Sequence, residues 1–155
     1  MNVIINPAKT CAFTGHRTLS ADINERKIKA EIKKLIKDGF DTFLCGMAIG
    51  FDITAGKIIA KLKKKNNLKL IACIPCENQS SRYDKKQKED YDYILSVADD
   101  VVLVSKEYTP SCMQKRNIYM VDRCSVVLAY LRQERGGTVN TVKYAEKVGK
   151  KVIVI

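Results

Sequence analysis

Two glycines and a threonine, Gly136-Gly137-Thr138, lie between an apolar run over residues 125–130 and a helical pattern that ends near Gly149. Glycine lacks a β-carbon, so a backbone that contains it can turn sharply and approach a ligand closely. The first amides of a helix have no partner inside that helix, and the helix dipole there favours an anion. The segment therefore predicts a phosphate-binding loop, although two glycines that only turn a corner would fit the same letters.

A second glycine turn, Gly15-His16-Arg17, follows the apolar run at residues 10–14. A guanidinium at such a turn can bind phosphate through two parallel hydrogen bonds, so Arg17 is a candidate ligand residue. His16 is the only histidine in the sequence, which argues against a metal site built on imidazoles. We weigh two kinds of role for it: a phosphate contact or proton transfer, and a structural hydrogen bond.

A third glycine turn, Gly46-Met47-Ala48-Ile49-Gly50-Phe51-Asp52, follows the short run at residues 41–45. Its two glycines would let the backbone approach a ribose or a second phosphate. Asp52 falls in the first turn of the helical pattern that follows. A carboxylate is favourable there by itself, and it can also accept a hydrogen bond from a ribose hydroxyl, so both interpretations stay open.

These turns are positioned by an alternation of apolar runs and amphipathic helical segments. The runs cover residues 10–14, 41–45, 68–74, 101–104, 125–130 and 151–155. Short apolar strands separated by helices predict an α/β, Rossmann-like fold of three layers, α/β/α, whose mostly parallel sheet has about six strands. In such sheets ligands bind beyond the carboxyl ends of the strands, so the three turns should converge on one edge.

The sequence indicates some helix boundaries more clearly than others. Asp22-Ile23-Asn24-Glu25 has the spacing of a capping box and predicts the start of the first helix. Gly39 and Gly149 fall where helices should end. Residues 76–88 show little periodicity, and a helix is expected there only from around Tyr91.

Length and composition predict one domain, residues 1–155, with 46% hydrophobic residues to build its core. No apolar run approaches the roughly 20 residues that span a bilayer, and no secretion signal is recognisable, so we expect a cytoplasmic protein without membrane insertion. The net charge of +11 would attract phosphates and nucleic acid. The lysine runs, however, have helical spacing and no interleaved aromatic residues, which favours solvated helix faces over a nucleic-acid patch.

The six cysteines do not resemble a disulfide framework and mostly fall in or beside apolar runs. Cys73-Ile74-Pro75-Cys76 has the spacing of a redox pair. Such pairs usually open a helix, where the dipole lowers a thiol pKa, whereas this one closes a strand. A redox or metal role is therefore not favoured, and no metal site is predicted.

Several motifs together resemble YpsA-like proteins of the SLOG superfamily. They occur in the family's order: Thr14-Gly15-His16-Arg17, Gly46 to Asp52, Ile74-Pro75-Cys76 with Gln79 and Tyr83, residues 113–122, and Gly136-Gly137-Thr138. The resemblance runs from about residue 10 to the C-terminus and is more specific than any one glycine motif. It implies a Rossmann-like fold and a ligand derived from a nucleotide, such as NAD or ADP-ribose, together with a regulatory role.

The resemblance and the turns together predict a ligand site without catalytic residues. The phosphate would bind the amides of residues 136–138 with Arg17 or Arg116, residues 46–50 would approach the ribose or a second phosphate, and Pro75 with Tyr83 would flank the base. The predicted ligand-binding residues are Gly15, His16, Arg17, Gly46, Met47, Gly50, Asp52, Pro75, Tyr83, Arg116, Asn117, Gly136, Gly137 and Thr138.

The same superfamily contains the LOG phosphoribohydrolases, which release the base from a nucleoside monophosphate. Arg116 matches an arginine of their signature, and Gly136-Gly137-Thr138 resembles a shortened form of their glycine turn. Thr141 stands where they have a catalytic Glu, and a hydroxyl cannot supply that carboxylate.

We therefore favour a non-catalytic nucleotide-binding protein over three alternatives. These are a hydrolase that uses His16 or Asp52, a nucleic-acid binder like DprA, and, by fold analogy alone, a molybdenum-cofactor carrier. Related enzymes pair through helices near the arginine segment, which implies a possible homodimer.

Overall fold

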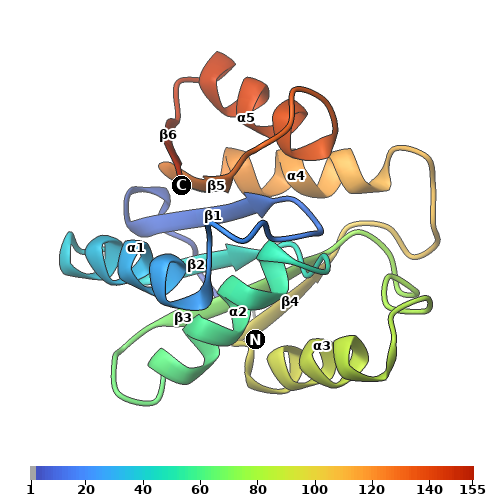
Figure 1. Ribbon diagram of the computed structural model, residues 1–155, viewed down its shortest axis with the longest axis horizontal. Coiled ribbons are helices and arrows are strands. Elements are labelled where there is room, and N and C mark those ends of the chain that lie inside the picture. Colours follow the sequence, from blue (N-terminus) through green and yellow to red (C-terminus); the bar gives the residue numbers. More distant parts are fainter. Residues whose placement is uncertain (1–2) are drawn as a thin grey trace.

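The computed structural model describes residues 3–155 and contains a six-stranded, wholly parallel sheet (Figure 1). The strands are β1 (Thr10–Gly15), β2 (Thr42–Cys45), β3 (Lys69–Ile74), β4 (Asp100–Leu103), β5 (Val126–Tyr130) and β6 (Lys151–Val154). Their order across the sheet is β4-β3-β2-β1-β5-β6. The predicted Rossmann-like α/β fold is confirmed, and every strand boundary lies within one residue of its predicted position.

Five α-helices cover the two faces of this sheet. They are α1 (Glu25–Lys37), α2 (Phe51–Leu62), α3 (Lys85–Val97), α4 (Cys112–Asp122) and α5 (Gly137–Lys147), and a short 3-10 helix spans Pro7–Lys9. Figure 1 shows α1, α2 and α3 on one face and α4 and α5 on the other. None of the helices among residues 3–155 has the length and apolar character needed to cross a membrane.

The two faces of the sheet bury side chains of different size. The face under α1, α2 and α3 holds the large aromatics: Phe13 stacks on Phe43, and Phe51 stacks on Tyr130. The face under α4 and α5 holds smaller strand residues such as Ala12 and Ala129. Because both faces are buried, the strands read as continuous apolar runs rather than as an alternating pattern.

Two helix starts differ from the sequence prediction. The predicted capping box at residues 22–25 is wrong, because the N-cap of α1 is Asn24, whose side chain accepts a hydrogen bond from the Lys27 amide. Asp22 instead forms an ion pair with Arg132, 3.0 Å away. Conversely, α3 begins at Lys85 in a full capping box formed by Asp84 and Gln87, a signal within the stretch predicted to be irregular.

The order of the strands reverses at β1, which pairs with β2 on one side and β5 on the other. The carboxyl ends of these three parallel strands therefore lie side by side, with Gly15 of β1 level with Tyr130 of β5. In open α/β sheets this switch point is where ligands bind.

Candidate functional site

The three predicted glycine turns all lie at this edge of the sheet. Residues 15–17 follow β1, residues 46–50 follow β2, and residues 131–136 lead from β5 into α5. The convergence expected from the sequence is thus present in the fold. Ligand binding by these residues stays a prediction, and the contacts below show what each one does in the protein itself.

The turns after β1 and β2 interlock through close contacts. The Phe51 amide donates to the His16 carbonyl at 3.1 Å. Gly50 has φ +88°, and a β-carbon on it would lie 2.1 Å from the Arg17 carbonyl oxygen. A β-carbon on Gly15 would lie 2.5 Å from the Phe51 side chain. The packing of this chain therefore accounts for glycine at positions 15 and 50.

His16 holds the turn after β5 to the turn after β1. Its Nε2 accepts hydrogen bonds from the backbone amides of Arg132 at 2.8 Å and Gln133 at 3.2 Å. An imidazole nitrogen that accepts is unprotonated, so the proton of the neutral ring is on Nδ1. Desolvation, and then the charge of Arg132, lower the pKa of His16 below 6.5. Of the two roles weighed from the sequence, these contacts match the structural hydrogen bond.

Arg116 reaches this edge from α4, and it is only 5% exposed. Its Nη1 donates to the Gly46 carbonyl, and its Nε donates to Oδ1 of Asn117 at 2.7 Å. Asn117 thus orients the guanidinium of Arg116. Among residues 3–155, Arg116 forms no ion pair with a carboxylate. Arg17 is exposed and also has no ion pair within the described chain.

Asp52 lies on the other side of Gly46 and is also 5% exposed. Its Oδ2 accepts from the Ala48 amide at 3.3 Å, whereas its Oδ1 is buried without a hydrogen-bond partner. Burial raises the pKa of Asp52 to about 6, against the opposing effects of Arg116 and the Ala48 amide. This carboxyl group is the least satisfied polar group of the site.

Gly46 separates these two buried charges. A β-carbon on Gly46 would lie 2.8 Å from Nη1 of Arg116 and 2.9 Å from Oδ2 of Asp52. No backbone strain demands glycine here, because the positive-φ glycines are at positions 39, 50, 136 and 149. Glycine at position 46 therefore leaves room for the close approach of the two charged side chains.

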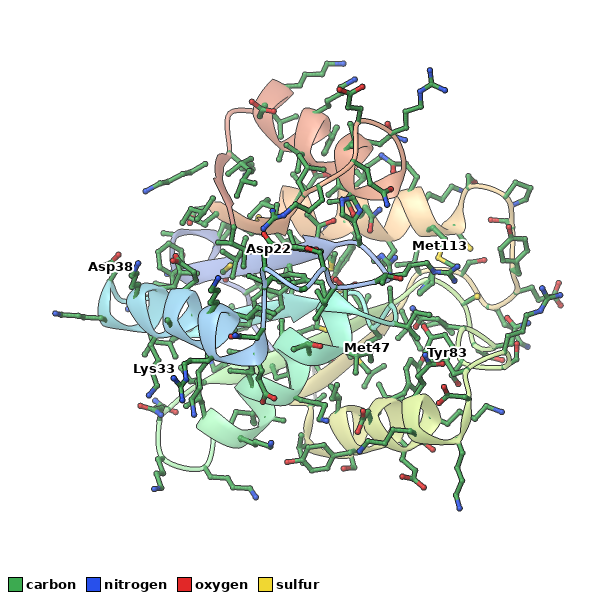
Figure 2. The ribbon with its side chains drawn as sticks, in the orientation of Figure 1. Asp22, Lys33, Asp38, Met47, Tyr83 and Met113 are labelled. Atoms are coloured by element: carbon green, nitrogen blue, oxygen red, sulfur yellow. The ribbon has the colours of Figure 1, made fainter. Side chains whose placement is uncertain are left out.

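A further clamp fixes the turn after β2. Gln79 donates to the Gly46 carbonyl at 2.9 Å and accepts from the Tyr91 hydroxyl at 3.1 Å. The Tyr83 hydroxyl donates to the carbonyl of Met47, which has φ +64°. Burial raises the pKa of Tyr83 to about 12, so it stays a hydroxyl donor. Figure 2 shows Met47, Tyr83 and Met113 on the side of the molecule towards which the strands point.

Gln79 is the residue that the site prediction left out. It stands in one of the motifs that resemble the YpsA-like proteins, and that motif was the only signal for it. Pro75, which was predicted to flank the base, is buried at the end of β3, and its carbonyl accepts from the Ser105 amide at 3.0 Å.

The turn between β5 and α5 differs from the other two because it leaves open space beside its glycines. Gly136 has φ +115°, which accounts for glycine there. Gly137 has no positive φ, and a β-carbon on it would meet nothing within 4 Å. Thr138 is buried, and the Thr141 hydroxyl donates to the Gly137 carbonyl at 2.8 Å. Neither strain nor packing accounts for glycine at position 137.

The helix starts at this edge fall into two classes. Side chains of Asn24 and Asp84 cap α1 and α3. In contrast, α2, α4 and α5 begin without a side-chain cap. The Phe51 and Ile53 amides of α2 already donate to the His16 and Ala48 carbonyls, and the Cys112 amide of α4 donates to the Thr109 carbonyl. Among the described residues, the first amides of α5 have no such backbone partner and remain available to an anion. Of the three helices without a side-chain cap, α2 follows β2, α5 follows β5, and α4 carries Arg116.

The cysteine pair at the end of β3 does not have the surroundings of a redox site. Cys73 and Cys76 are both buried. Burial raises the pKa of Cys73 to about 12, and burial followed by the nearby Cys112 raises that of Cys76. Protonated, enclosed thiols are poor nucleophiles. The residues described include no cluster of three His, Cys, Asp or Glu side chains suited to a metal ion.

Two surface hollows lie away from the switch point. One, of about 440 Å³, is lined by residues that include Val3, Asp100, Tyr119 and Arg123, near the start of β4. The other, of about 490 Å³, lies along the outer side of α1. Neither includes a predicted ligand residue.

Comparison with known proteins places the chain in a family. Residues 10–152 match the YpsA family model, described as the YspA SLOG family. The SPbeta prophage-derived protein YoqJ of Bacillus subtilis is 33% identical over 135 residues, which are 78% of this chain and 79% of YoqJ. A UPF0398 protein of Bacillus pumilus is 28% identical over 143 residues, covering 84% of this chain and 77% of its own length.

Two solved structures share the fold. DNA processing protein A (DprA) from Streptococcus pneumoniae superposes with a TM-score of 0.73 at 22% identity, over 95% of this chain and 50% of that one. DprA from Helicobacter pylori, whose single-stranded DNA binding mode has been studied, gives 0.71 at 20% identity, over 96% of this chain and 65% of that one. The chain thus spans only part of each DprA. The chain belongs to the YpsA family of SLOG proteins.

Proposed function

We propose that this protein binds an anionic ligand of the nucleotide type at the switch point and does not itself catalyse a reaction. The observation behind this proposal is Arg116, a buried cation without a carboxylate partner among residues 3–155. It lies on α4, which packs against α5, and α5 begins without a side-chain cap. A buried charge costs several kcal/mol unless it is paired. An anionic ligand would supply the missing partner.

The donors of Arg116 are only partly used by the protein. A guanidinium has five N–H groups. Here they reach one carbonyl, one side-chain amide and, weakly, the sulfur of Met113 at 3.9 Å. The remaining donors, the exposed Arg17 and the uncapped amides of α5 can together bind phosphate.

Gly137 supports the position of the phosphate. Neither its backbone conformation nor its packing calls for glycine, and the space beside its Cα is empty of protein atoms within 4 Å. A missing β-carbon at the first residue of a helix lets a phosphate reach the amides directly. A ligand that extends from there towards residues 46–50 would bring its base near Tyr83.

The state of the candidate catalytic groups supports a non-catalytic role. The Thr141 hydroxyl is bonded to the Gly137 carbonyl, and His16 Nε2 is bonded to two backbone amides. Asp52 is enclosed and 5% exposed. Release of free base from nucleoside monophosphates, abolished by His16→Ala with Asp52→Ala, would instead establish a hydrolase.

Isothermal titration calorimetry against NAD, ADP-ribose and AMP tests the proposal. We expect at least one of these to bind saturably and to lose binding in the double variant Arg116→Ala, Gly137→Val. Arg26→Ala, which removes an exposed arginine from α1, is the control for net charge. Binding that survives the double variant rules out the site, and binding of none of the three overturns the proposal.

Nucleic acid is the second candidate ligand, favoured by the fold shared with DprA and by the net charge of +11. Fluorescence anisotropy with a labelled single-stranded oligonucleotide would measure it. The affinity should then fall steeply and linearly with salt on logarithmic axes, because phosphate contacts release counterions. A flat salt dependence ends this alternative. A homodimer, a cytoplasmic location and a single domain over residues 1–155 stay predictions.

A further inference from the structure

We propose that the site takes up its anion together with one proton, which is held by the Asp52 carboxyl group. This inference rests on the proposed function and adds to it a coupling between ligand binding and pH. It comes from the arrangement of the two buried charged side chains on either side of Gly46.

The first observation is the spacing of Arg116 and Asp52. Both approach the same point, the missing β-carbon of Gly46, to within 2.8 and 2.9 Å, yet they form no ion pair. Arg116 is directed to the Gly46 carbonyl and Asp52 to the Ala48 amide. Asp52 therefore offsets the charge of Arg116 at a distance, and an anion that binds Arg116 would be close to a second negative charge.

The second observation is the unpartnered oxygen of Asp52. Oδ1 is buried and accepts no hydrogen bond. An ionised carboxylate loses solvation by burial and needs donors, whereas a protonated one needs fewer. The charged and titratable groups facing Asp52 are Arg116 on α4, Cys45 on β2 and Tyr83 in the segment before α3. Only Arg116 among them favours the ionised form.

An anion on Arg116 would remove that support. The anion would offset the positive charge of the guanidinium and add a negative charge nearby. The Asp52 carboxyl group would then take a proton from solvent and become neutral. The pKa of Asp52 is already raised to about 6 without ligand, so a further rise brings it into the neutral range. Affinity should be highest below about pH 6 and should fall, by up to about tenfold per pH unit, as the pH rises above it.

ADP-ribose is a suitable probe because its phosphates are diesters that do not titrate near pH 6. Calorimetry at pH 7 in buffers of different ionisation enthalpy should show proton uptake by the wild-type protein. Asp52→Asn should abolish the Asp52 share of that uptake and bind ADP-ribose about 10- to 100-fold more tightly at pH 7.5, as expected for removing a charge several ångströms from the anion. His16 is unchanged in both proteins, so any proton that it binds or releases cancels in the comparison.

Asp38→Asn is the matched control, since it makes the same change in net charge. Asp38 is exposed after α1, on the side of the molecule away from Met47 (Figure 2). Sulfate serves as a second probe, because it is an anion that has no ribose hydroxyl to donate to Asp52. Tighter binding of both probes to Asp52→Asn supports proton-coupled anion binding.

Three outcomes overturn the inference. If Asp52→Asn weakens ADP-ribose but not sulfate, then Asp52 accepts from a ligand hydroxyl instead. If ADP-ribose binding depends on Arg116 but the wild-type protein takes up no more protons than Asp52→Asn, the inference fails while the proposed function stands. If neither probe binds, both fail.

Discussion

Replacing Gly137 by alanine should stabilise the fold and weaken ligand binding at the same time. The residue has no positive φ, and its new methyl group would meet no atom within 4 Å. Such a Gly→Ala change gains about 0.4–1 kcal/mol by restricting the unfolded chain. For a domain of this size that corresponds to an increase in Tm of about 1–4 °C.

The methyl group would occupy the space through which we expect phosphate to reach the α5 amides. Losing one hydrogen bond to a charged ligand costs about 1.5–3 kcal/mol, so affinity for ADP-ribose should fall about tenfold or more. Scanning calorimetry measures the first effect and titration calorimetry the second. A glycine that only turns a corner would give the stabilisation without the loss of affinity, and that result would refute the proposed position of the phosphate.

Gly39→Ala is the control with the opposite expectation. Gly39 also has nothing within 4 Å of its β-carbon position, but its φ is +99° and it follows α1 at the other end of the sheet. Alanine there should lower stability by about 1 kcal/mol, since left-handed backbone disfavours a β-carbon, and should leave affinity unchanged. A rise in stability with a loss of affinity for Gly137→Ala, and a fall in stability with unchanged affinity for Gly39→Ala, would separate binding from folding.

Three further predictions concern the framework of the site. Gly50→Ala should lower the free energy of unfolding in urea by about 3 kcal/mol or more. The new β-carbon would be strained by the left-handed backbone and would lie 2.1 Å from the Arg17 carbonyl oxygen. An unchanged urea midpoint would contradict the interlocked turns. The His16 pKa lies below 6.5, so the stability contributed by its neutral form should be present above pH 6.5 and lost as the pH falls through the folded pKa; an NMR titration midpoint above 6.5 would disprove this. Asp84→Ala should cost about 1 kcal/mol in thermal unfolding by removing the α3 cap, and no change would mean that the capping box does not stabilise α3.

The strands and the site edge were predictable because their signals are local. Parallel strands buried on both faces appear as apolar runs, and glycine turns lie between three of them and the helices that follow. The start of α1 has no single local signal, because Asp22, Asn24 and Glu25 all have side chains that can cap a helix and lie within four positions. Only the fold shows that the Asp22 carboxylate accepts a hydrogen bond from Arg132, 110 residues along the chain, instead of capping α1.

The contacts that define the site join residues far apart in the sequence. Arg116 and Gly46 are separated by 70 positions, and His16 and Arg132 by 116. No local pattern shows that His16 accepts from the turn after β5, or that Gly46 makes room for two charged side chains. The sequence also gives no way to distinguish Gly136 from Gly137, whereas in the fold only Gly136 has a positive φ, which accounts for glycine at that position.

A crystal structure of the protein with ADP-ribose would test the central claim most directly. We expect the diphosphate at the carboxyl ends of β1, β2 and β5, within about 3 Å of the Arg116 guanidinium and the first amides of α5. Density for the ligand in the hollow beside Asp100 and Arg123, with an empty switch point, would contradict the account.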